Sequence, residues 1–103
     1  MLPDPGPRFE RDYGCTEAEW RSWLPRATHG HDWAYDGAEP ACAARVQVDG
    51  GTLRLAWRVL EPRRIALIVL PRLEVRFEYD GVPEAARRAF QRRFDASLQR
   101  GGG

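Results

Sequence analysis

The stretch CAARVQVDGGTLRLAWRVL, residues 42–60, decides the fold class. On both sides of its centre, small or apolar residues alternate with polar ones, which is the two-residue period of a strand with one buried face. At the centre, Asp49-Gly50-Gly51 supplies residues that tolerate the positive φ of a tight turn. We therefore expect a hairpin of two antiparallel strands, Cys42–Val48 and Thr52–Leu60. The inward side of the first strand comprises Cys42, Ala44, Val46 and Val48.

Two further strands are expected after this hairpin. Ile65–Leu70 is apolar at every position, which is typical of a strand covered on both faces. Arg72–Tyr79 alternates between apolar and charged residues and predicts a half-buried strand. The turn between hairpin and third strand is expected at residues 61–64, and Pro71 either separates strands Arg64–Leu70 and Arg72–Tyr79 or bends one long strand. We favour two strands, which makes a four-stranded antiparallel meander.

One helix is expected before the strands in the sequence, and a second helix after them. Thr16 and Glu19 have the spacing of a capping box, and Pro25 should end the short helix that follows, Glu17–Leu24. Pro83 suits the first turn of a longer C-terminal helix that packs on the sheet. Its apolar side comprises Ala86, Phe90, Phe94 and Leu98.

These patterns predict a single α+β domain over residues 1–103, in the order α-β-β-β-β-α. Residues 1–8, rich in proline, are expected to form a flexible lead-in, and residues 101–103 a flexible glycine tail. The connection from Pro25 to Ala41 is predicted to be irregular, apart from one short strand around Asp32–Tyr35.

Composition limits the classes of partner. Sixteen basic residues, all arginine, against fifteen acidic residues give a formal net charge of +1, so no global field attracts nucleic acid or an acidic membrane. The arginine, alanine and glycine bias suits GC-rich codons and a bacterial source. The longest apolar run, Ile65–Leu70, is too short to cross a bilayer, and residues 1–12 lack the pattern of a secretory signal. We expect a cytoplasmic protein without a membrane partner, in which Cys15 and Cys42 stay reduced.

The segment THGHDWAYDG, residues 28–37, is the candidate ligand site. A structural zinc site needs four nitrogen or sulfur ligands, usually in close pairs, and the pair His29-Gly30-His31 has no second pair to complete it. We therefore predict no metal and no other cofactor. The alternative is a small-molecule pocket or active site rimmed by this loop, with aromatic rings that stack on the ligand. Its residues would be His29, His31, Asp32, Trp33 and Tyr35.

No catalytic constellation can be assembled from the motifs present. Ser22 and Ser97 both lie in predicted helices, and no glycine-rich phosphate loop joins a strand to a helix. We therefore favour a non-catalytic binding or protein-interaction module over an enzyme. Nucleic-acid binding through the C-terminal helix is a further, less favoured alternative, because Phe90 and Phe94 face inward instead of standing among its arginines. These arginines are Arg87, Arg88, Arg92, Arg93 and Arg100.

The third expected strand leaves an apolar stripe on the outer face of the sheet. If its odd-numbered residues face the core with the C-terminal helix, then Ala66, Ile68 and Leu70 point outward. Such a stripe needs a cover, which could be the first helix with Trp20 and Trp23, a small molecule or a second subunit.

We expect the cover to be a protein, and specifically a two-fold homodimer that forms through the outer face of the sheet or the edge beside it. The stripe is bordered by arginines and glutamates that a two-fold axis can place opposite one another. The predicted interface residues are Ala66, Ile68, Leu70, Arg58 and Arg76.

Overall fold

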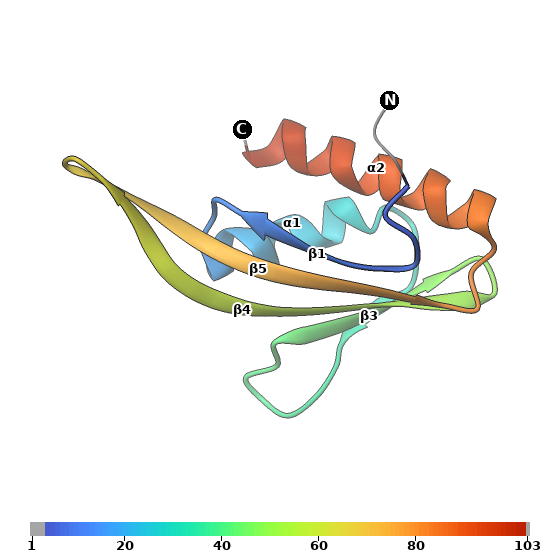
Figure 1. Cartoon of the computed structure of the whole chain (residues 1–103). Helices are drawn as coiled ribbons and strands as arrows, with labels where there is room; N and C mark the ends of the chain where they lie inside the picture. Colours follow the sequence, from blue (N-terminus) through green and yellow to red (C-terminus); the bar gives the residue numbers. More distant parts are fainter. Residues whose placement is uncertain (1–3, 103) are drawn as a thin grey trace.

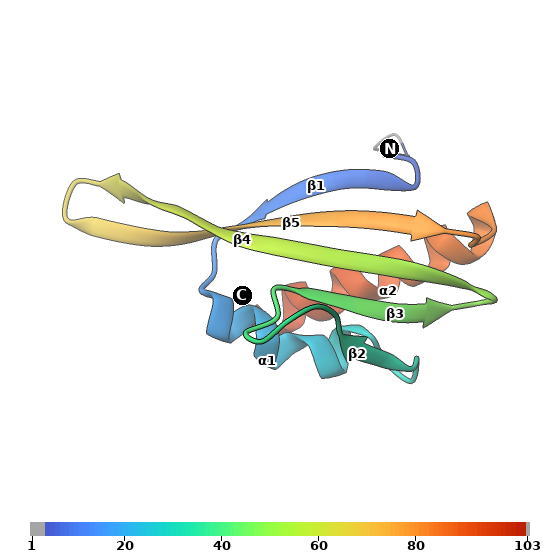
Figure 2. The same ribbon diagram turned by 90° about the horizontal axis from the view of Figure 1, so that it is seen from below.

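The computed structural model describes residues 4–102, with side chains described to residue 98. It is an α+β structure in which one antiparallel sheet carries both helices on the same face (Figure 1). Seen from below, the other face of the sheet carries no helix (Figure 2). The strand order is β1-β5-β4-β3-β2. The elements are β1 (Arg8–Tyr13), α1 (Glu17–Ala27), β2 (Trp33–Tyr35), β3 (Ala43–Val48), β4 (Gly51–Ile65), β5 (Ile68–Asp80) and α2 (Glu84–Gly102).

The sheet has five strands, so the predicted number of four is wrong. The missed strand β1 pairs antiparallel with β5, from Arg8↔Glu78 to Tyr13↔Leu73. Four of its six residues are charged, so its pattern resembles a solvated segment, and only the partner strand identifies it. The short strand expected around Asp32–Tyr35 is β2, which pairs with β3 at the opposite edge.

The described residues before β1 contact helix α2. Residues 1–3 and 103 lie outside the described residues. Asp4 accepts two hydrogen bonds from the buried guanidinium of Arg87, at 2.8 and 2.9 Å, and this ties the segment before β1 to α2. Helix α2 itself continues to Gly102.

The central hairpin has the predicted turn. Asp49 (φ 45°) and Gly50 (φ 85°) form the turn between Val48 and Gly51, the last residue pair of β3 and β4. Ala44, Val46 and Val48 face the core as expected. Cys42 does not, because it precedes β3 and lies exposed beside the first turn of α1.

The predicted third strand and its flanking turns are wrong. Residues 61–64 belong to β4, with a bulge between Leu60 and Arg63, and the chain reverses at Ala66 (φ 54°) and Leu67. Pro71 lies within β5, so it does not separate two strands. The segment predicted to be buried on both faces is therefore the tip of one long β4–β5 hairpin.

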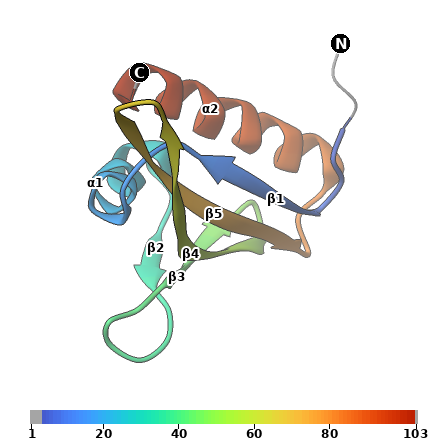
Figure 3. The ribbon, with the colours of Figure 1, turned by 60° about the vertical axis from the view of Figure 1, so that its left-hand side comes forward.

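We call residues 59–72 the arm, because here β4 and β5 extend beyond their other neighbours in the sheet. The pairing of β5 with β1 ends at Leu73, and that of β4 with β3 ends at Ala56. Figures 1 and 3 show the arm projecting from the body and curving toward the side that carries the helices. The expectation that Ile65, Leu67 and Val69 face the core is wrong, since every residue from 61 to 70 is exposed.

The core lies between the sheet and the two helices. Trp20 of α1 is fully buried at its centre, with its ring 5.6 Å from Tyr13, 5.7 Å from Trp57 and 6.0 Å from Phe94, measured between centroids. The first helix therefore covers the inner face, not the outer stripe for which Trp20 and Trp23 were considered as a cover. The buried strand residues of this core are Ala44, Val46, Val48, Leu53, Leu55, Trp57, Leu73, Val75, Phe77 and Tyr79.

Both helices begin or pack largely as predicted. The Thr16–Glu19 capping box is present, with both reciprocal hydrogen bonds formed. Helix α1 passes through Pro25 and ends at Ala27, because the buried side chains of Leu24 and Ala27 hold the last turn against the core. Within the described residues, neither helix is both long and apolar enough to span a membrane.

Candidate interaction surface

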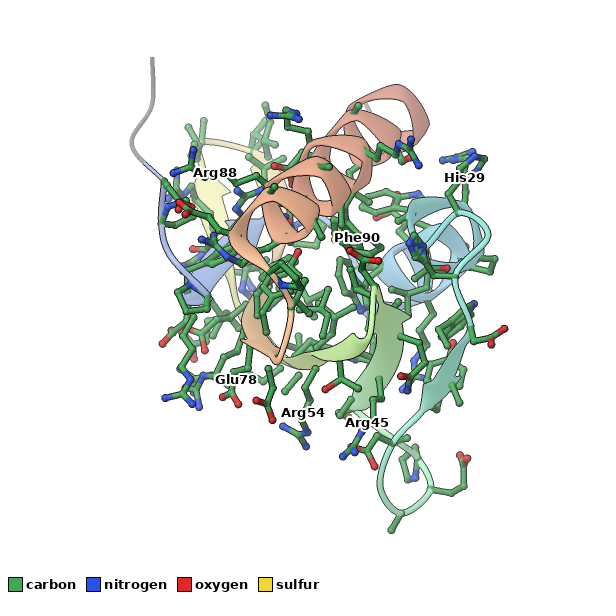
Figure 4. All side chains as sticks on the ribbon, turned by 90° about the vertical axis from the view of Figure 1, so that its right-hand side faces the viewer. His29, Arg45, Arg54, Glu78, Arg88 and Phe90 are labelled. Atoms are coloured by element: carbon green, nitrogen blue, oxygen red, sulfur yellow. The ribbon has the colours of Figure 1, made fainter. Side chains whose placement is uncertain are left out.

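The two histidines of the 28–37 segment do not converge. His29 has a φ of 26° and its side chain points to solvent, as Figure 4 shows. His31 packs edge-on against Phe90 of α2, with ring centroids 5.0 Å apart. Phe90 lies between α2 and the sheet, so His31 contributes to the junction between that helix and the loop. Among the described residues, no three His, Cys, Asp or Glu side chains gather as a metal site would require.

The aromatic residues of β2 stack on their own chain. Trp33 and Tyr35 lie edge to face at 5.2 Å, and Tyr35 in turn lies 6.4 Å from Trp57. The guanidinium of Arg21 lies over both Tyr35 and Trp57, at 5.1 and 5.4 Å from the ring centroids. The rings of Tyr35 and Trp57 are therefore partly covered by an arginine of α1, which reduces the area left on them for a stacking ligand.

Asp32 and Asp36 accept hydrogen bonds from residues of the sheet, near the edge formed by β2. The backbone carbonyl of Asp32 accepts the amide of Gln47, and the carboxylate of Asp36 accepts from Arg45 and Arg54 at 3.2 and 3.3 Å. Hydrogen bonds from these two arginines hold the pKa of Asp36 below its usual range. Asp36 thus fastens the loop after β2 to the outer face of the sheet.

Outside the arm, the outer face of the sheet carries many charged side chains. Across the register Arg54 lies opposite Glu78 and Arg58 opposite Glu74, whereas Arg45 lies opposite Arg54. Arg45, Arg54 and Glu78 project from the side opposite the helices (Figure 4). Arg58 pairs with Glu74 at 2.9 Å, and Arg72 pairs with Asp12 at 2.6 Å. Exposed pairs of this kind contribute little to stability, but they keep this face hydrated.

The arm differs from this charged surface because its exposed side chains are mostly apolar. Leu67 at the tip is 100% exposed. The register fixes which side of the ribbon each residue occupies: Ile68 pairs with Ile65, and Leu70 with Arg63, on the outer side. The exposed large apolar residues of the arm are Val59, Ile65, Leu67, Ile68, Val69 and Leu70.

The predicted interface residues are divided between these two regions. Ile68 and Leu70 lie on the outer side of the arm, and Ala66 lies in its turn. Arg58 stands at the base of the arm, whereas Arg76 lies farther along β5, opposite Ala56. The rest of the exposed arm lies outside the predicted interface, because Ile65, Leu67 and Val69 were expected to face the core. The uninterrupted apolar run from Ile65 to Leu70 is the sequence feature that could have indicated this exposed surface.

The arginines of α2 are not one exposed patch. Arg87 is buried on Asp4, and Arg88 binds both Asp4 and Glu84. Arg92 and Arg93 are exposed, and the side chain of Arg100 lies outside the described residues. Comparison with known proteins found no family model and no curated protein that matches this chain.

Proposed function

We propose that this chain is a non-catalytic protein-interaction module that binds its partner through the arm. The observation that carries the proposal is the exposure of the arm: residues 61–70 are all exposed, and Leu67 completely so. Monomeric proteins rarely expose a contiguous apolar patch larger than a few hundred Å² unless it serves recognition. Of the large hydrophobic side chains exposed in the described chain, only Tyr35 lies outside the arm.

The turn of the arm supports the same proposal. Ala66 adopts a φ of 54°, a left-handed conformation that glycine, asparagine or aspartate adopts at lower cost. The chain uses Asp49 and Gly50 for its other hairpin turn, yet it has alanine and leucine here. A local departure from favourable turn chemistry is typical of a functional position. The departure increases the apolar surface at the tip.

The rival proposal, a ligand pocket or active site rimmed by His29–Asp36, has less support. Its histidines are separated, and Arg21 covers part of the ring faces of Tyr35 and Trp57. Burial raises the pKa of the Cys15 thiol to about 11, which makes it a poor nucleophile. Cys42 lies beside the carboxylate of Glu17, at 3.8 Å, and not beside a histidine.

Site-specific photocrosslinking in the native cells tests the proposal. A photoreactive phenylalanine analogue at position 67 should give covalent protein adducts, because Leu67 is at the exposed tip. The same analogue at Ala85, an exposed position on α2, is the matched control and should give none. Equal yields at the two positions, or no adduct at position 67, would contradict binding through the arm.

A further inference from the structure

We infer that the partner of the arm is a second copy of this chain, and that two arms pack against each other through their outer sides about a two-fold axis. This inference rests on the proposed function and specifies the partner. The interface expected from the sequence lies on the outer face of the sheet or the edge beside it. Of its residues, Ala66, Ile68 and Leu70 belong to the arm, whereas Arg58 and Arg76 lie outside it. The outer face outside the arm carries paired charges, whereas the outer side of the arm is mainly aliphatic, with Arg63 and Arg72 as its charged residues.

The two sides of the arm are unequal, and this selects the contact side. The outer side carries Leu60, Ile65, Ile68 and Leu70, since each lies in register with an outer-side residue of the neighbouring strand. The side that continues the core face carries Val59 and Val69 as its large exposed hydrophobics. The outer side therefore offers more apolar area for burial.

The edges of the arm argue for packing through side chains instead of strand addition. Pro62 stands in β4 next to the bulge, and Pro71 stands in β5, so each edge strand contains a residue without an N–H. The amide of Tyr79 donates toward β1, so by alternation Pro71 faces that same edge of β5, which is free within the arm. Prolines and bulges are features that keep edge strands from pairing with other chains.

The same edges favour a protein over a lipid surface. The ribbon has unpaired backbone groups along both edges of the arm, and each would lose its hydrogen bonds to water in a hydrocarbon layer. When two arms pack face to face, these edges stay in water. A face-to-face dimer thus buries the apolar side chains without that cost.

A second copy supplies the complementary surface that this chain lacks elsewhere. Apart from the arm, Tyr35 is the only large hydrophobic residue exposed in the described chain, so the body offers no apolar seat for an arm. An identical arm offers the same set of aliphatic side chains, which makes the contact isologous.

The length of the arm also fits a small specific interface. Specific complexes bury about 800 Å² per partner, and the exposed aliphatic side chains of the arm are the apolar surface available for such a contact. The full set is exposed by between 42% and 100% in the single chain. Covering it is expected to give association in the micromolar range, where a few well-buried anchors dominate the affinity.

Sedimentation of the full chain tests the inference. Wild type should form a dimer of twice 11.8 kDa within about 1 to 100 µM. Ile68→Asp should raise the dissociation constant at least about tenfold, because it places a charge in the contact. Val69→Asp is the matched control, since it introduces the same charge one residue away on the other side of the ribbon, and it should change the constant by less than about threefold. Circular dichroism should show all three proteins folded, because both positions are exposed.

Three results with the purified chain would overturn the inference. The first is a wild type that stays monomeric throughout this range, and the second is equal loss of association in Ile68→Asp and Val69→Asp. The third is binding of monomers to anionic phosphatidylserine vesicles, abolished by Ile68→Asp, which would make lipid the occupant. A position-67 adduct with a mass other than twice 11.8 kDa, from a monomeric wild type, would refute the homodimer and leave the proposed interaction function standing.

Discussion

The indole N–H of Trp57 donates to the Glu17 carboxylate at 2.9 Å, and this bond joins the first turn of α1 to the centre of β4 across forty residues of sequence. Trp57 is 5% exposed, so its N–H depends on this acceptor. The same oxygen of Glu17 accepts from Arg21 at 3.0 Å. The hydrogen bond from Trp57 is the main cause that lowers the pKa of Glu17, ahead of the contribution from Arg21.

Removing the carboxylate of Glu17 should destabilise the domain by more than an ordinary surface substitution. Glu17→Ala leaves a buried indole N–H without an acceptor, and we expect a loss of about 1–2 kcal/mol in the free energy of unfolding, measured by urea denaturation. Glu17→Gln retains an oxygen acceptor and should cost less. Glu84→Ala is the control, because Glu84 also stands in the first turn of a helix but binds only exposed Arg88. Equal losses in Glu17→Ala and Glu84→Ala would show that helix electrostatics, not the indole, explains the effect.

Gly51 is required by close backbone contact, not by its φ angle. A Cβ built on Gly51 would lie 2.4 Å from the carbonyl oxygen of Asp80 and 2.5 Å from that of Gly81. Gly51→Ala must therefore separate β4 from the end of β5, and we expect a destabilisation of about 2–3 kcal/mol. At Gly14 the nearest atom would be 4.0 Å away, so Gly14→Ala should be neutral or slightly stabilising. Thermal unfolding of the two variants checks the contrast, and similar melting temperatures would contradict it.

Local patterns predicted the parts of the fold that rest on local chemistry. Alternation located the β3–β4 hairpin and the second half of β5, the turn residues located Asp49–Gly50, and the Thr16–Glu19 spacing located the start of α1. Each of these signals depends on neighbours close in sequence, so no knowledge of the tertiary structure was needed.

The errors occurred where a distant partner decides the outcome. Strand β1 is mostly charged and forms only because β5 offers it an edge. Arg87 was considered among the helix arginines that could bind nucleic acid, yet it is buried and forms an ion pair with Asp4. The apolar run from Ile65 to Leu70 looks the same whether it is covered or projects into solvent, so its sequence could indicate a contact surface but not its place on an arm.

The two cysteines should differ sharply in reactivity. Cys15 is 2% exposed and burial raises its thiol pKa to about 11, whereas Cys42 is exposed. At about pH 8, an aromatic disulfide reagent should modify Cys42 quickly and Cys15 only after unfolding by denaturant. Cys42→Ser should abolish the fast phase, and Cys15→Ser should retain it. Fast modification in Cys42→Ser would mean that the environment of Cys15 opens readily.

The arm should be dispensable for folding. Residues 61–70 are all exposed, so their removal takes no side chain from the core. Replacing residues 61–71 with Asn-Gly joins the paired residues Leu60 and Arg72 through a favourable two-residue turn. We expect the free energy of unfolding of this variant to stay within about 1 kcal/mol of wild type, by urea denaturation of monomeric protein.

The shortened chain should nevertheless lose association, because it lacks Ile65, Ile68 and Leu70. A second variant, with these three residues replaced by threonine, keeps the length and β propensity of the arm and should lose association too. Loss in the shortened chain alone would assign the contact to the backbone or length of the arm. Unfolding of the shortened chain at low concentration would instead show that the arm stabilises the body, contrary to the exposure of its side chains.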